Sequence, residues 1–126
     1  MEITTENFNV VIESAEIPVV VFVKASWCSK CKAFVPVYEK VIKEQEGIAN
    51  FHYLTVDDNE ELTKYIKIMG VPTVLFFMHG VLIAKQIGSQ SANSMKRTIE
   101  SLIYLTPEEA QNKEYRSWFS RLFERK

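Results

Sequence analysis

Two cysteines stand three positions apart in the segment Trp27-Cys28-Ser29-Lys30-Cys31-Lys32. Two thiols at this spacing can close a small disulfide ring, although C-x-x-C is also half of a zinc site. A cysteine at a helix N-terminus faces free backbone N–H groups and the positive end of the helix dipole, and both stabilise a thiolate. We therefore predict that Cys28 is an exposed nucleophile, that Lys30 helps to lower its thiol pKa, and that Cys31 is a more buried resolving thiol.

Other interpretations of the cysteine pair remain open at this point. A four-ligand zinc site within the chain needs two more ligands, but His52 falls in a predicted strand and His79 in a predicted turn, both far from the cysteines in sequence. A metal site bridged between two chains would avoid this difficulty. The two cysteines would also be compatible with unreactive thiols in a hydrophobic core.

Composition limits the class of protein. The chain has 126 residues, of which 47% are hydrophobic and 25% charged, as expected for one globular domain. A formal charge of −1 argues against binding to nucleic acid or anionic lipid. The first residues do not resemble a secretory signal, and the apolar run Ile17 to Val23 is too short to cross a bilayer. We expect a cytoplasmic protein.

The elements around the cysteines alternate between strands and helices. The β-branched run 17–23 predicts a strand buried on both faces, and apolar spacing predicts a helix from Cys28 to Glu46 that contains Pro36 and ends at Gly47. A strand over 50–56 follows, and then a short helix through Leu62, Tyr65 and Ile66 that ends at Gly70. The cysteine pair is thus expected where a central strand passes into a long helix.

The second half of the chain predicts a hairpin and another helix. Strands over 73–78 and 81–87 flank the tight turn His79-Gly80, and Ser91 is a cap for a helix with Met95, Ile99 and Leu102 on one face. Near the N-terminus, Glu2-Ile3 is a candidate short strand, followed by a short helix. These elements predict an α/β protein with a mixed sheet between helices.

The last residues are predicted to form an additional C-terminal amphipathic helix. Thr106-Pro107-Glu108-Glu109 combines a cap, a proline at the first helical position and a glutamate three residues after the cap. We place the main domain at 1–105 and the extension at 106–126. Three roles remain open for the aromatic face of this helix: added core, a surface for a partner or for self-association, and a membrane-interface helix. That face consists of Tyr115, Trp118, Phe119, Leu122 and Phe123.

Several motifs together resemble the thioredoxin family. They are the run 19–36 with W-C-x-x-C-K at its centre, Gly70-Val71-Pro72-Thr73 before the hairpin, and Gly88 after it. The resemblance spans residues 1 to 104 and implies a thioredoxin-like fold, a mixed sheet of four or five strands with helices on both faces, and a cis Val71–Pro72 bond. It also implies a shallow groove for an extended substrate, lined by Trp27, Val71, Pro72 and Gly88.

The chain departs from the family pattern at two places. Thioredoxins carry a buried acid in the central strand and often a lysine near it, where this sequence has Phe22 and Tyr53. The usual proton relay to the resolving cysteine is therefore missing. In addition, Ser29-Lys30 replaces the Gly-Pro of the typical reductant, which is expected to stabilise the Cys28 thiolate and shift the pair toward a more oxidising potential.

These observations predict a thiol–disulfide oxidoreductase, a thioredoxin-like protein-disulfide reductase with a role in cell redox homeostasis. It would act on disulfide-containing proteins or small disulfides, without a bound cofactor or metal, and would need an external electron donor such as a thioredoxin reductase. The alternative is a binding or redox-sensing module in which the fold is a scaffold and the aromatic C-terminal helix engages a partner.

Overall fold

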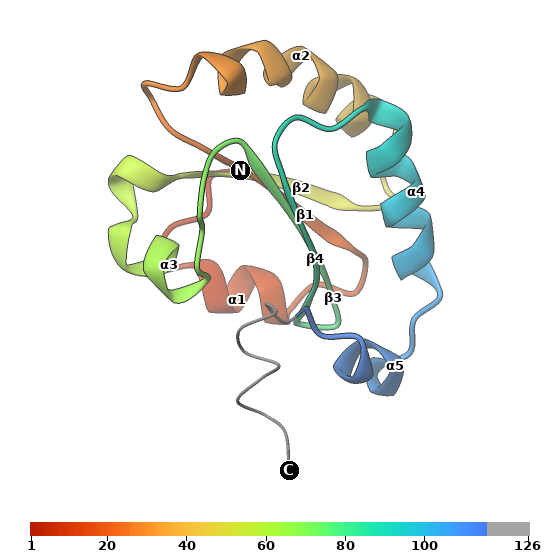
Figure 1. The fold of residues 1–126 in the computed structure, drawn as a ribbon. Helices are drawn as coiled ribbons and strands as arrows, with labels where there is room; N and C mark the ends of the chain where they lie inside the picture. The colour runs from red at the N-terminus through yellow and green to blue at the C-terminus, as the bar shows by residue number, and fades with distance from the viewer. Residues whose placement is uncertain (116–126) are drawn as a thin grey trace.

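The computed structural model describes residues 1–115, which form a sheet with helices on both of its faces (Figure 1). Within these residues the sheet has four strands in the order β2-β1-β3-β4. The strand bounds are β1 Val19–Lys24, β2 Asn50–Thr55, β3 Thr73–Met78 and β4 Val81–Ile87. The predicted α/β fold with a mixed sheet is confirmed.

Strand β1 lies at the centre of the fold. It pairs in parallel with β2 and antiparallel with β3, and its first five residues are buried. A run of valines suits such a position because β-branched side chains pack well on a pleated surface that is covered on both sides. Strand β4 pairs only with β3 in the described sheet, so it forms one edge.

The helices divide between the two faces of the sheet. Helices α1 (Phe8–Glu13) and α3 (Glu60–Tyr65) cover one face, and α2 (Ser29–Glu44) and α4 (Ala92–Ile103) cover the other (Figure 1). A short 3-10 helix, η1 (Val56–Asp58), precedes α3, and α5 (Pro107–Asn112) follows α4. Ser91 caps α4 as predicted, because its hydroxyl accepts a hydrogen bond from the Ser94 N–H at 3.0 Å.

Three predicted boundaries differ from the structure. Glu2 makes a single bridge to Tyr53 and does not form a fifth strand. Helix α2 begins after Cys28, its N-cap, and ends at Glu44. Helix α3 ends at Tyr65, well before Gly70, and Lys67 takes a positive φ of 56°. The early end of α3 has a tertiary cause, because the Lys85 ammonium binds the carbonyl oxygens of Ile66 and Lys67 at 2.9 and 3.0 Å.

The C-terminal helix is shorter than predicted. Thr106 and Glu109 form the expected capping box and Pro107 begins α5, but the helix ends at Asn112. Tyr115 lies outside it, since its backbone N–H donates to Leu82 O on β4 at 2.7 Å and its ring faces Lys85. Contacts with the sheet edge therefore replace the helical hydrogen bond at this residue. Trp118, Phe119, Leu122 and Phe123 lie outside the described residues. No helix in residues 1–115 is long and apolar enough to span a membrane.

Candidate active site

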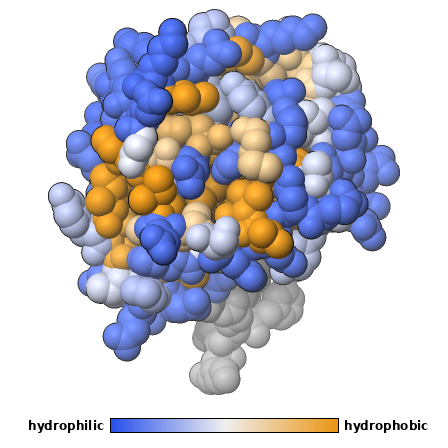
Figure 2. All heavy atoms as spheres, turned by 180° about the vertical axis from the view of Figure 1, so that it is seen from behind, coloured by the Kyte–Doolittle hydropathy of each residue, from blue (hydrophilic) through white to orange (hydrophobic). Residues whose placement is uncertain are grey.

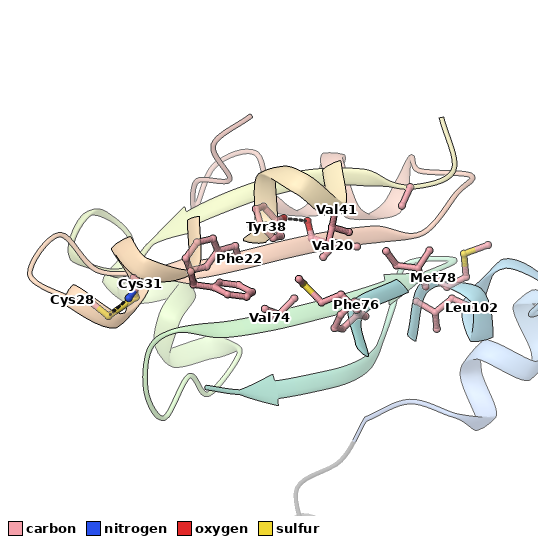
Figure 3. Close-up of a cluster of buried hydrophobic side chains, with 14 of the residues drawn as sticks. Val20, Phe22, Cys28, Cys31, Tyr38, Val41, Val74, Phe76, Met78 and Leu102 are labelled. Atoms are coloured by element: carbon pink, nitrogen blue, oxygen red, sulfur yellow. Dashed lines mark hydrogen bonds between the residues drawn. A yellow bond between two sulfur atoms is a disulfide. The ribbon is translucent and has the colours of Figure 1, made fainter. Parts of the chain in front are cut away.

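The two cysteines lie at the start of α2 and form a disulfide (Figure 3). Cys28 is the N-cap of the helix in an extended conformation, and its Sγ accepts a hydrogen bond from the backbone N–H of Cys31 at 3.1 Å. The Cα atoms of the two residues are 5.3 Å apart. The chain turns into α2 through the Cys28 N–H, which donates to Ala25 O. The Cys31 N–H, in the first turn of α2, is therefore directed at the sulfur of Cys28.

Both sulfur-bearing residues are buried in this oxidised form. Cys28 is 6% exposed and Cys31 is 2% exposed, so the expected exposed position of Cys28 is wrong. The reason is packing, since both cysteines belong to the hydrophobic cluster between the sheet and α2. Trp27, by contrast, is 73% exposed and does not belong to the core.

A second loop reaches the same end of the sheet as the cysteines. The Val71–Pro72 peptide bond is cis, as the family resemblance implies, and the Gly88 N–H donates to Pro72 O at 2.8 Å. Gly88 has a φ of 94°, a conformation that residues with a Cβ rarely adopt, so the glycine is needed here. Val71 packs against the cluster that contains both cysteines. The fold thus brings together Val71, Pro72 and Gly88, which are widely separated in sequence from the dithiol.

Sequence reasoning missed an interaction that fixes the approach to the dithiol. The Asp57 carboxylate accepts hydrogen bonds from the backbone N–H and the hydroxyl of Ser26, at 3.2 and 2.8 Å. These bonds, the hydroxyl first, hold the pKa of Asp57 below its ordinary value. An aspartate directly after a strand end was the available signal. The interaction holds the backbone immediately before Trp27.

Large apolar side chains also lie on the surface, and the face seen from behind shows hydrophobic residues gathered among hydrophilic ones (Figure 2). Met69, two residues before Val71, is 82% exposed, and Ile87, directly before Gly88, is 59% exposed. Neither residue stood out in the sequence, because exposure is a property of the tertiary structure. Both residues are close in sequence to the predicted groove residues Val71 and Gly88, so exposed apolar side chains accompany that part of the chain.

An aromatic cluster lies beneath the cysteines where thioredoxins have a buried acid. Phe22 lies beside Tyr38, with ring centroids 5.2 Å apart (Figure 3). The Phe34 ring centroid is 5.0 Å from that of Phe22, and the strand register places Phe22 beside Tyr53. Burial raises the pKa of both Tyr38 and Tyr53. The buried polar residues within 1–115 are His52, Asn59 and Thr73, so no buried carboxylate replaces the missing one in this part of the chain.

Metal binding finds no support in the described residues. Among residues 1–115, no group of three or more histidine, cysteine, aspartate or glutamate side chains is gathered in a way that could hold a metal ion. His52 lies buried on β2, while the ring of His79 shares a hydrogen bond of 2.7 Å with Leu105 O. The cysteine sulfurs are bonded to each other.

Comparison with known proteins agrees with this geometry. The thioredoxin family model matches residues 1–101. Thioredoxin C-2 of Corynebacterium nephridii and thioredoxin of Staphylococcus saprophyticus are each 32% identical over 100 residues, covering 79% of this chain and 93% and 94% of those proteins. The bifunctional thioredoxin reductase/thioredoxin of Mycobacterium leprae is 27% identical over 103 residues, which are 82% of this chain but 22% of that longer protein. With its cysteine pair at a helix start, the chain belongs to the thioredoxin family and is a thiol–disulfide oxidoreductase.

Proposed function

We propose that this protein reduces disulfides in proteins or small molecules, with Cys28 as the attacking thiolate and Cys31 as the resolving one. The observation that carries the assignment is the hydrogen bond from the Cys31 N–H to Cys28 Sγ. This bond and the helix N-terminus favour negative charge on the Cys28 sulfur in the reduced protein. Lys30, exposed in the first turn of α2, adds positive charge nearby.

The reaction consists of two exchange steps. The Cys28 thiolate attacks one sulfur of the substrate disulfide, forms a mixed disulfide, and releases the other substrate sulfur as a thiolate. The Cys31 thiolate then attacks the Cys28 sulfur and releases the second substrate thiolate. Two electrons pass to the substrate, and the protein is left with the Cys28–Cys31 disulfide seen in this structure.

Substrate binding is assigned to the groove residues Trp27, Val71, Pro72 and Gly88. The exposed indole of Trp27 offers an apolar surface. The loop that carries Val71 and Pro72 lies at the same end of the sheet as the dithiol and is tied to Gly88 through a backbone hydrogen bond. Such a surface suits an extended substrate segment that has an apolar residue next to its disulfide. The exposed side chains of Met69 and Ile87 strengthen the expected preference for apolar substrate residues.

Trapping the mixed disulfide tests the roles of the two cysteines. Reduced Cys31→Ser protein mixed with insulin should give a covalent adduct through Cys28, detectable by intact mass and removed by dithiothreitol. The matched Cys28→Ser protein should give no adduct, because the remaining thiol is more buried and lacks the helix N–H donor. If the Cys28→Ser protein formed the adduct and the Cys31→Ser protein did not, the roles would be reversed.

Regeneration requires an external dithiol donor, and we propose a thioredoxin reductase. Support comes from the relative whose name joins thioredoxin reductase and thioredoxin in one protein.

We further assign residues 1–105 to the redox domain and 106–126 to an extension, and we propose a cytoplasmic location. The family match over residues 1–101 supports the first boundary.

The reduction potential decides the direction of electron flow. Equilibration with glutathione and dithiothreitol buffers, followed by thiol alkylation and mass measurement, gives the potential of the pair. A value near that of thioredoxin, about −270 mV, supports a reductant, whereas a value toward about −180 mV supports an oxidant or isomerase. Because Ser29-Lys30 occupies the position of Gly-Pro, we expect a value above that of thioredoxin. Failure to form the disulfide at any potential would overturn the proposed activity.

A further inference from the structure

The chain returns to the open edge of the sheet after α5. Helix α5 packs beside β4, near the turn that joins β3 and β4 (Figure 1). Beyond the helix, the backbone N–H of Tyr115 donates to Leu82 O on β4 at 2.7 Å. Since β4 is the edge strand, this bond uses a carbonyl that the sheet leaves unpaired. The last described residue is therefore held at a defined place.

The side chain of Tyr115 is held at the same place as its backbone. Its ring centroid lies 5.2 Å from the Lys85 ammonium, within the range of a cation–π contact. Lys85 itself is fixed by the carbonyl oxygens of Ile66 and Lys67 at the end of α3. Tyr115 thus has two attachments to β4, its backbone to Leu82 and its ring to Lys85, and Lys85 in turn contacts the end of α3.

A groove opens beside Tyr115, between α1, the end of α3 and the start of β4. We call it the α1/α3/β4 groove. Its volume is about 470 Å³, within the roughly 300–1,000 Å³ of pockets that accept small ligands. The apolar part of its lining consists of Phe8, Ile12, Ile66, Phe77 and Leu82. It lies toward the far end of β3 from the Val71–Pro72 loop, since Phe77 and Gly80 line it.

We propose that the α1/α3/β4 groove is the docking site of the chain's own C-terminal segment, residues 116–126, with Phe119 entering it. The sequence continues for eleven residues beyond Tyr115 and carries four large apolar side chains: Trp118, Phe119, Leu122 and Phe123. Residues four apart share a side of the chain both in a helix and in a strand, so Phe119 falls on the side of Tyr115 in either conformation. Four residues reach about 6 Å as a helix and about 14 Å when extended, which suffices for the adjoining groove.

The covalent connection to Tyr115 favours residues 116–126 over a separate partner as the occupant of the groove. A segment joined to the groove through a short connection is present at an effective concentration on the order of millimolar. Tyr115, which already lines the groove, brings the segment to its mouth. The docking is independent of the redox reaction, because the groove contains neither cysteine.

Site-specific photocrosslinking of the full chain tests the docking directly. Phe119 is replaced by the photoreactive benzoylphenylalanine, and the crosslinked peptides are identified by mass spectrometry. We expect crosslinks within a monomer to peptides that contain residues 8–13, 65–67 or 80–82. The matched control places the same group at Tyr104, which is 88% exposed and does not line the groove. Crosslinked dimers would show that a second copy is the occupant, and crosslinks elsewhere or to no protein would equally overturn the proposal.

Hydrogen exchange of conventional variants gives an independent measurement. In the full chain, Phe119→Ser should increase amide exchange in α1 and at the end of α3 at least several-fold, because the groove loses its cover. Tyr104→Ser should leave exchange in those segments unchanged. Equal exchange of α1 in the parent and the Phe119→Ser protein would contradict the docking, whatever their disulfide-exchange activity.

Discussion

The two faces of the sheet are filled by different kinds of side chain. Strand β1 directs Val20 and Phe22 toward α2 and α4, where aromatic rings pack around the cysteines, and directs Val19, Val21 and Val23 toward α1 and α3, where the packing is mainly aliphatic. Both cysteines belong to the aromatic face. Packed rings therefore lie beneath the dithiol, at the positions where thioredoxins carry an acid and a lysine, while the opposite face is mainly aliphatic.

This replacement changes the surroundings of Cys31. Phe22 and Tyr53 are neighbours in the register of β1 and β2, so the two positions at which the chain departs from the family's acid and lysine are adjacent. Rings supply buried apolar area but no proton acceptor near neutral pH, and the pKa of Tyr53 is raised further by burial and by Glu39. The proton that the Cys31 thiol loses before the second exchange step therefore passes to a group outside this cluster.

The largest expected effect comes from restoring the acid. Phe22→Asp should destabilise the fold by more than about 4 kcal/mol at pH 7, because it leaves a cavity and buries an unpaired carboxylate. Burial raises the pKa of such a carboxyl, so part of the loss should be recovered at pH 4, where the group is protonated. Urea unfolding at both pH values measures the effect.

The double variant Phe22→Asp/Tyr53→Lys sharpens the same test. If the two positions form a pair, the lysine should recover stability at pH 7 beyond the sum of the two single changes. Additive effects in the double-mutant cycle would show that the two positions do not act together.

The next prediction compares the stability lost when each of two adjacent residues on opposite faces of β1 is replaced by alanine. Phe22→Ala should cost about 3–5 kcal/mol, whereas Val21→Ala removes two methyl groups and should cost about 2 kcal/mol. Both residues are at most 1% exposed, so the difference reports the size of the packed group and not its burial. Equal losses in urea unfolding would mean that the aromatic face is no more sensitive than the aliphatic one.

A smaller effect is expected from the hydroxyl of Tyr38. This group lies within hydrogen-bond distance of the carbonyl oxygens of His52 and Val20, at 2.8 and 3.1 Å, and so joins α2 to β1 and β2. Tyr38→Phe should cost about 1–2 kcal/mol, since it leaves a buried carbonyl without this donor. Tyr53→Phe is the matched control, because the structure gives the Tyr53 hydroxyl no hydrogen bond within the described residues. A larger loss in the control would contradict the bridging role of Tyr38.

Sequence patterns predicted the central strand, the hairpin and the helix that begins after Cys28, because each has a local cause. The valine run, the His79-Gly80 turn and the Ser91 cap act over a few residues. The early end of α3 and the short α5 escaped prediction, since Lys85 and Leu82 hold them from a distance.

The candidate site shows the same division between local and distant causes. The cysteine spacing identified the dithiol, but the predicted exposure of Cys28 was wrong, because Cys28 is packed in the core in the oxidised form. The contact of Asp57 with Ser26 also escaped notice, because it joins residues 31 positions apart. The spacing of the cysteines therefore identifies the reacting groups, whereas their exposure and the hydrogen bonds that fix the neighbouring backbone depend on tertiary packing.

The smallest effect concerns an ionisable group beside Val21, on the aliphatic face. His52 is 8% exposed, and burial, followed by the positive charge of the N-terminal ammonium, holds its pKa below the ordinary value of about 6.5. As the pH falls through 6.5, the unfolded chain gains the proton before the folded one, so stability present at pH 7.5 is lost toward pH 5.5. Comparing urea midpoints at these two pH values, we expect a decrease that is smaller in a His52→Gln protein, since glutamine does not titrate. An equal decrease in both proteins would show that a group other than His52 causes the loss of stability.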